Sequence, residues 1–112
     1  MYNLRYKIWL DKNGKVFGEG PFQLLKGIEE TGSLTSAARA MNMSYSQAHN
    51  LIKSLEKKLG FNLINSKTGG NGGGGSELTE EARLLMERYH KFSMECEQSL
   101  QAIFAKYFGN NN

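Results

Sequence analysis

One stretch of the chain, from Ser44 to Lys57, concentrates side chains that form hydrogen bonds or carry positive charge. These polar residues are Ser44, Tyr45, Ser46, Gln47, His49, Asn50, Lys53 and Lys57. Gln and Asn amides can form paired hydrogen bonds with adenine, while lysine can contact phosphate or guanine. Serine and tyrosine hydroxyls can serve either phosphate or a base. Ordinary solvated helices also carry such polar faces. The structural elements that position these side chains must therefore decide whether the face binds DNA.

The polar stretch is predicted to be a helix, with Ser44 before its first turn and Gln47 three residues later. This pair forms a capping box, in which each residue satisfies a free backbone N–H of the other. The buried stripe expected opposite the polar face consists of Ala48, Leu51, Ile52, Leu55 and Leu59. Gly60 ends the helix, because glycine readily adopts the left-handed conformation there.

A short helix over residues 35–41 is predicted to precede it, with only Asn42 and Met43 between the two. Its alanines allow another helix to approach closely. A second helix with a polar outer face suits the major groove of DNA, which is about 12 Å wide. Thr35 and Ser36 open the first helix and are also expected at the DNA. Residues 35–67 contain five basic residues and one acidic residue, which supports this interpretation.

Simple patterns define the flanking elements. Alternating apolar residues and a turn at residues 11–14 predict a β-hairpin over residues 3–18. A helix should begin at Pro21 and end at Gly32. Residues 61–66 are predicted to form a strand, and Thr79 to cap a last helix that runs to about Phe108.

The glycine-rich segment between that strand and that helix has three interpretations. Residues 70–75 match the dinucleotide fingerprint G-x-G-x-x-G, but any polyglycine run does so and no βαβ unit surrounds it. A flexible linker is the plain alternative. We favour the tip of a wing, where missing Cβ atoms let backbone N–H groups approach phosphates. The DNA contacts expected in this wing are Lys67, Thr68, Gly70, Asn71 and Gly72.

The last helix carries an apolar pattern with a spacing near 3.5 residues. Its members are Ala82, Leu85, Tyr89, Phe92, Cys96, Leu100 and Ile103. The pattern is also compatible with a helix packed on its own domain. A domain of this size can hardly cover so long a helix, so we expect these residues to form a homodimer interface. Two-fold symmetry then predicts two half-sites about one helical turn apart, or a multiple of it.

The composition permits a nucleic-acid partner without requiring one, and we expect the protein in the cytoplasm. The 112 residues carry a net charge of +3, with neither a membrane-spanning run nor a signal peptide. The single cysteine, Cys96, allows no internal disulfide. His49 and His90 stand far apart, without metal-ligand spacing. No nucleophile, base and orienting acid are grouped, so we expect no enzyme, catalytic residue, metal or cofactor.

Two motifs carry a family resemblance. The stretch GSLTSAA over residues 32–38, followed by the helix over residues 44–59, resembles the winged helix-turn-helix of LysR-type regulators. The Ser-Tyr start of the second helix, the TGGNGGGG wing and the following Leu78-Thr79 are similar to the ModE family of molybdate-responsive regulators. This resemblance implies a transcription factor whose second helix enters the major groove while the wing over residues 67–76 contacts the backbone.

The predicted fold is mainly α with small β elements: a winged helix-turn-helix with an N-terminal hairpin and a long C-terminal dimerisation helix. The DNA-binding domain should span residues 1–78, the long helix residues 79–108 and a tail residues 109–112. ModE proteins carry further molybdate-binding domains, so this chain is either part of a longer protein or a stand-alone module, and molybdate is not expected to bind it. The alternative function is a protein-interaction module that pairs with a partner through the winged-helix fold and the long helix.

Overall fold

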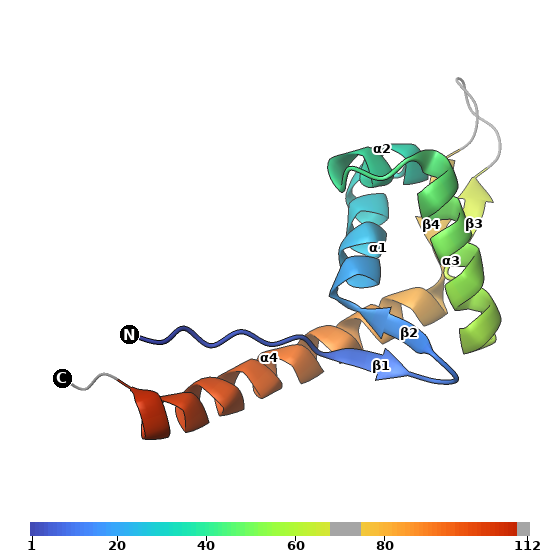
Figure 1. The fold of residues 1–112 in the computed structure, drawn as a ribbon. Helices are drawn as coiled ribbons and strands as arrows, with labels where there is room; N and C mark the ends of the chain where they lie inside the picture. Colours follow the sequence, from blue (N-terminus) through green and yellow to red (C-terminus); the bar gives the residue numbers. More distant parts are fainter. Residues whose placement is uncertain (68–74, 110–112) are drawn as a thin grey trace.

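The computed structural model describes residues 1–67 and 75–109 and confirms the predicted fold class. These residues form four helices and two small antiparallel sheets, arranged as Figure 1 shows. In chain order the elements are β1 (Trp9–Asp11), β2 (Lys15–Gly18), α1 (Glu19–Thr31), α2 (Leu34–Ala40), α3 (Tyr45–Leu59), β3 (Ile64–Lys67), β4 (Gly75–Leu78) and α4 (Glu80–Phe108). Within the described residues, no helix is long and apolar enough to cross a membrane.

Helix α1 begins at Glu19 rather than at Pro21, because the extended backbone of Gly18 forms its N-cap. Pro21 still lies in the first turn, where backbone N–H groups have no partner within the helix. The helix ends at Gly32 as predicted, with a left-handed φ of 73° and an N–H that donates to the Ile28 carbonyl. This tight end lets the chain turn directly into α2.

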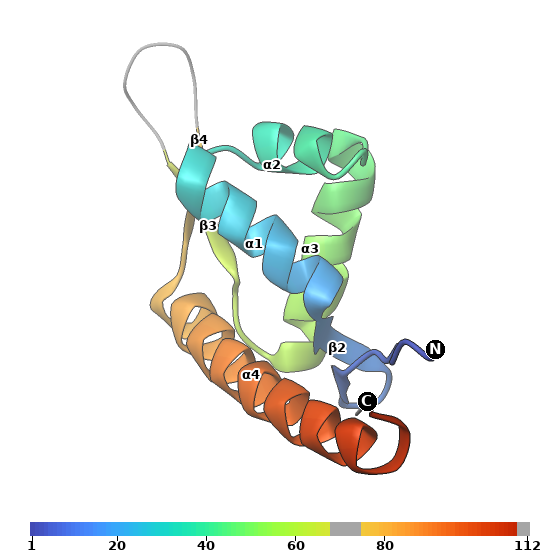
Figure 2. The same cartoon turned by 90° about the vertical axis from the view of Figure 1, so that its left-hand side faces the viewer.

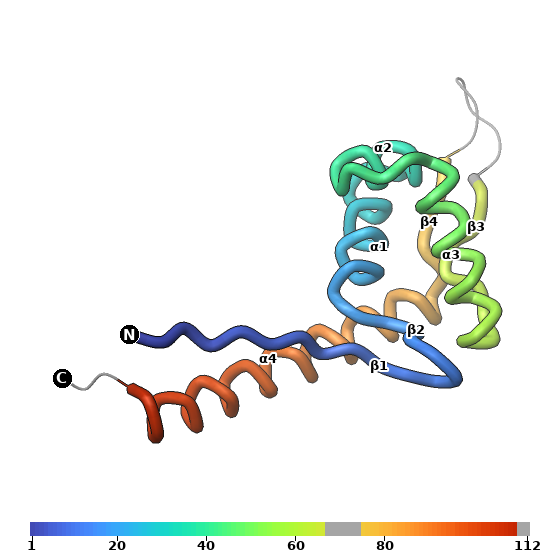
Figure 3. Tube along the Cα trace, in the orientation of Figure 1, coloured from blue at the N-terminus to red at the C-terminus, as the bar shows by residue number. Residues whose placement is uncertain are grey.

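The N-terminal hairpin is shorter than predicted, because residues 3–8 form no strand. Strand β2 is only four residues long and therefore offers those residues no backbone partner. They run instead beside α4. Figure 3 shows the two traces side by side, with the N-terminus near the end of α4. The Tyr89 hydroxyl donates to the Ile8 carbonyl at 3.0 Å, and the rings of Tyr2 and Phe108 meet edge to face.

One hydrophobic core joins all the helices. Phe17, Leu24, Leu25, Ile28 and Ile52 are completely buried in it. The first half of α4 closes the core with Ala82, Met86 and Tyr89. Beyond these residues α4 projects away from the domain, as the two views in Figures 1 and 2 show.

Candidate nucleic-acid interface

Helices α2 and α3 form a helix-turn-helix with a tightly bonded turn. The Met41 and Met43 N–H groups both donate to the Ala38 carbonyl, at 3.0 and 2.9 Å. Asn42 takes the left-handed conformation that reverses the chain, with a φ of 58°. Ser33 caps α2 through the Ser36 N–H, so α2 spans Leu34–Ala40 rather than the predicted residues 35–41. Thr35 is exposed on this helix, while the Ser36 side chain is half-buried.

The predicted capping box of α3 is present. The Gln47 N–H donates to Ser44 Oγ at 3.0 Å, and the Ser44 N–H donates to Gln47 Oε1 at 2.9 Å. Gln47 was predicted to read a base, but its amide oxygen is already engaged in the cap. While the cap stays intact, its NH2 group and one remaining lone pair of Oε1 are left to contact DNA.

The rest of the polar face of α3 lies on the surface. Tyr45, Ser46, Asn50, Lys53 and Lys57 are exposed, and His49 is half-buried. The Tyr45 and His49 rings stack with their centroids 5.7 Å apart, which makes one aromatic platform at the start of the helix. Figure 1 shows that α3 lies on the side of the domain opposite to the projecting end of α4.

Strands β3 and β4 form the base of the wing. They pair from Ile64↔Leu78 to Lys67↔Gly75, and the Ser76 N–H donates to the Gly32 carbonyl at 2.9 Å. The wing base is thereby attached to the end of α1, on the same side of the domain as α3 (Figure 1). Lys67 ends β3, whereas Thr68, Gly70, Asn71 and Gly72 lie outside the described residues.

Strand β3 begins at Ile64, not at the predicted residue 61. The backbone just before it is used elsewhere, because the Leu63 N–H donates to Glu56 and the Leu63 carbonyl accepts from the Thr79 N–H. Glu56 is buried, and sequence reasoning missed it as a functional candidate. Its spacing gave the signal, since residue 56 follows the buried Ala48 and Ile52 at steps of four on the same face.

The residues predicted for a dimer interface separate into two groups along α4. Ala82 and Tyr89 are 0% and 4% exposed in the core of their own domain, so they have almost no surface left for a partner. Leu85 is half-buried against the same core. Phe92 and Ile103 are exposed, and Cys96 and Leu100 are half-buried.

Elsewhere in residues 1–67 and 75–109, the titratable groups form no comparable site. In the described part of the chain, no three His, Cys, Asp or Glu side chains are grouped as metal ligands. Tyr6 lies beside α4, where desolvation raises the pKa of its hydroxyl above 10.0, with smaller contributions from Glu97 and Cys96. This hydroxyl therefore stays neutral at physiological pH.

These elements define a winged helix-turn-helix protein. The chain belongs to the lysR family of bacterial regulatory helix-turn-helix proteins, whose family model matches residues 22–83. The fold is also that of the crystal structure of the CbnR_DBD–DNA complex, at a TM-score of 0.58 and 20% identity, over 77% of this chain and 93% of that one.

Curated relatives confirm the resemblance to ModE proteins. The chain is 28% identical over 90 residues to the molybdenum transport protein ModE of Azotobacter vinelandii, covering 80% of this chain and 33% of the relative. It is 43% identical over 65 residues to the ModE protein of Herbaspirillum seropedicae, covering 58% and 24%. The chain therefore spans a third or less of the length of these relatives.

Proposed function

We propose that this chain binds double-stranded DNA as part of a transcriptional regulator, with α3 in the major groove and the wing on the neighbouring backbone. One observation carries the proposal: a capped helix presents an exposed polar face beside the wing base, on the side opposite to the projecting α4. The aromatic platform, Asn50 and the lysines of this face supply groups for bases and phosphates. Such a protein acts by binding DNA and not by catalysis. Its proposed location is the cytoplasm, where bacterial DNA lies.

The regulated genes are proposed to concern molybdenum. The relatives that support this are named ModE and molybdenum transport protein, and the chain covers only a minor part of each. Direct binding of molybdate to these residues is not part of the proposal. The signal that controls DNA binding would reach this chain from elsewhere.

We also propose that two copies pair through the outer part of α4. An open groove of about 720 Å³ follows this part of the helix, and its apolar lining includes Ile8, Phe92, Cys96 and Leu100. Phe92 and Ile103 remain 48% and 55% exposed in the single chain. A second copy of the same helix would cover these side chains and hold two α3 helices at a fixed spacing on DNA.

Salt dependence of binding tests the DNA proposal. A fluorescently labelled duplex, selected from a random library by the wild-type protein, is titrated with protein at increasing salt concentration. The logarithm of the affinity should fall linearly with the logarithm of the salt concentration, with a slope near −0.9 for each phosphate contact. Lys57→Ala should make this slope shallower by about 0.9, and Lys53→Ala by less than this, because Lys53 is also paired with Glu56.

Lys26→Ala is the matched control, because Lys26 is an exposed lysine on α1 in the groove that faces α4. It should leave the slope unchanged. If wild-type protein shows no salt-sensitive affinity for any duplex, the DNA proposal is wrong, and the interaction module becomes the better account.

A further inference from the structure

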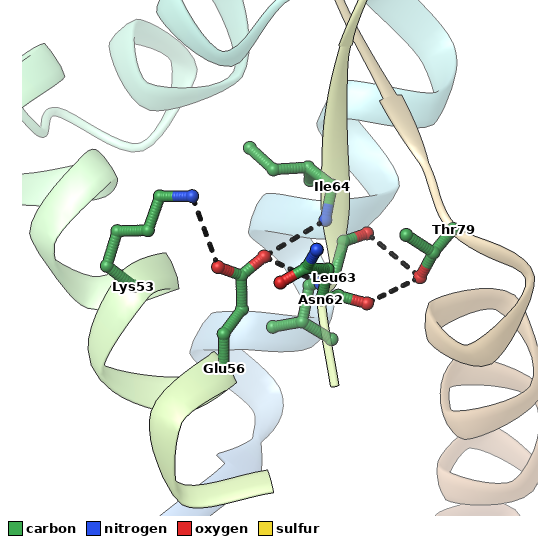
Figure 4. Close-up of polar contacts among 6 residues, drawn as sticks. All are labelled: Lys53, Glu56, Asn62, Leu63, Ile64 and Thr79. Atoms are coloured by element: carbon green, nitrogen blue, oxygen red, sulfur yellow. Dashed lines mark hydrogen bonds and ion pairs between the residues drawn. The ribbon is translucent and has the colours of Figure 1, made fainter. Parts of the chain in front are cut away.

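The two carboxylate oxygens of Glu56 contact different elements, one the start of strand β3 and the other a lysine on helix α3. Its Oε2 accepts hydrogen bonds from the Leu63 N–H at 2.7 Å and the Ile64 N–H at 3.3 Å. Its Oε1 forms an ion pair with Lys53 Nζ at 3.3 Å. Figure 4 shows this arrangement, with Glu56 between Lys53 on one side and the start of β3 on the other.

The start of β3 is also held from its opposite side, by Thr79. The Thr79 hydroxyl donates to the Asn62 carbonyl at 2.7 Å, and the Thr79 N–H donates to the Leu63 carbonyl at 3.0 Å. Thr79 is at the same time the N-cap of α4. The N–H groups of residues 63 and 64 are thus bonded to α3, and the carbonyls of residues 62 and 63 are bonded to the N-cap of α4 (Figure 4).

A buried carboxylate needs such partners, because an ionised group removed from water is strongly destabilising unless it is paired and hydrogen-bonded. Among the described residues Glu56 is the one charged residue that is buried, with 7% of its side chain exposed, whereas 55% of the Lys53 side chain is exposed. The ion pair therefore has a fixed inner end and an outer end that solvent or a phosphate can reach.

We infer that Glu56 is a positioning residue for DNA binding: it fixes the start of strand β3 against α3 and holds Lys53 at a set position relative to this strand. This inference rests on the proposed function. The carboxylate also compensates part of the Lys53 charge, and a phosphate must compete with it for the ammonium group. Glu56 thus lowers the non-specific attraction to DNA and increases discrimination between DNA sequences, because Lys53 and strand β3 are held at one spacing.

Two substitutions separate these roles. In Glu56→Gln the amide oxygen still accepts the bonds from Leu63 and Ile64, but the negative charge beside Lys53 is gone. In Glu56→Ala both the hydrogen-bond acceptor and the negative charge are lost. Glu87→Gln is the matched control, because Glu87 forms an ion pair with Lys91 at 3.4 Å on the exposed surface of α4. It changes the net charge equally and frees a lysine far from α3.

The experiment measures affinity for the selected duplex and for a scrambled duplex of equal length, over a range of salt concentrations. Glu56→Gln should bind the scrambled duplex more tightly than Glu87→Gln at low salt, with a slope steeper by up to about 0.9, because Lys53 is free for a phosphate. Glu56→Ala should lower the ratio of selected to scrambled affinity about tenfold, whereas Glu56→Gln should keep it within about twofold.

A salt slope of Glu56→Gln equal to that of Glu87→Gln would overturn the inference. So would a folded Glu56→Ala protein that discriminates like the wild type. If Glu56→Ala does not fold, as judged by circular dichroism, the Glu56→Gln comparison decides alone. Failure of the proposed function is visible separately, since the wild-type protein would then not bind either duplex in a salt-dependent way.

Discussion

The close contact between α1 and α2 predicts how one added carbon atom changes the free energy of unfolding. A Cβ added at Gly27 would lie 2.9 Å from the Ala37 Cβ and 3.3 Å from the Ala37 Cα. Neither atom can move without its helix, so Gly27→Ala must push α2 away from α1. Overpacking of this kind costs about 1–3 kcal/mol, and the better helix propensity of alanine returns about 1 kcal/mol at most. We expect a net loss of about 1–2 kcal/mol.

Gly20→Ala is the internal control for this substitution. Gly20 lies in the same helix, and an added Cβ would meet no atom within 4 Å. This variant should be unchanged or more stable by up to about 1 kcal/mol. Urea unfolding followed by circular dichroism, at one protein concentration, gives both values. A Gly27→Ala protein as stable as Gly20→Ala would refute the close packing of α1 on α2.

Substitutions at four further positions test the caps and the proposed dimer. Ser44→Ala removes the capping box of α3 and should lower the free energy of unfolding by about 1 kcal/mol in a urea titration; an unchanged midpoint would mean that the cap is not formed in solution. Thr79→Val loses the hydroxyl that binds Asn62 and caps α4, so it should lose about 1–2 kcal/mol, while Thr79→Ser should stay close to wild type. If both Thr79 variants unfold alike, the hydroxyl contributes nothing. Phe92→Asp should yield monomers in sedimentation without loss of helical signal, and an unchanged mass would refute the interface. Leu85→Asp is a less selective probe, because Leu85 also packs on the core.

Signals that act over a few residues were readable from the sequence. The capping box at Ser44, the left-handed glycines 32 and 60, and the Thr79 cap are all present. Each depends only on groups that lie within three or four residues of one another in the sequence. For the same reason the polar face of α3 and its place in the helix-turn-helix were predictable from spacing alone.

Features that depend on distant partners were not predictable. Alternation over residues 3–8 predicted a strand, yet β2 is too short to pair with it, and the segment lies along α4. Ala82 and Tyr89 fit the pattern of a dimer interface but are buried in their own domain. Helical spacing places Glu56 on the buried face of α3, but no local pattern shows that the backbone N–H groups of residues 63 and 64 bond to it.

Dimethyl sulfate footprinting on the selected duplex tests the central claim most directly. The reagent methylates guanine N7, which lies in the major groove, and adenine N3, which lies in the minor groove. If α3 enters the major groove as a pair of copies, saturating protein should protect guanine N7 in two patches about one helical turn apart, or a multiple of it. Salt-sensitive binding that leaves every guanine N7 fully reactive would contradict the placement of α3 in the major groove.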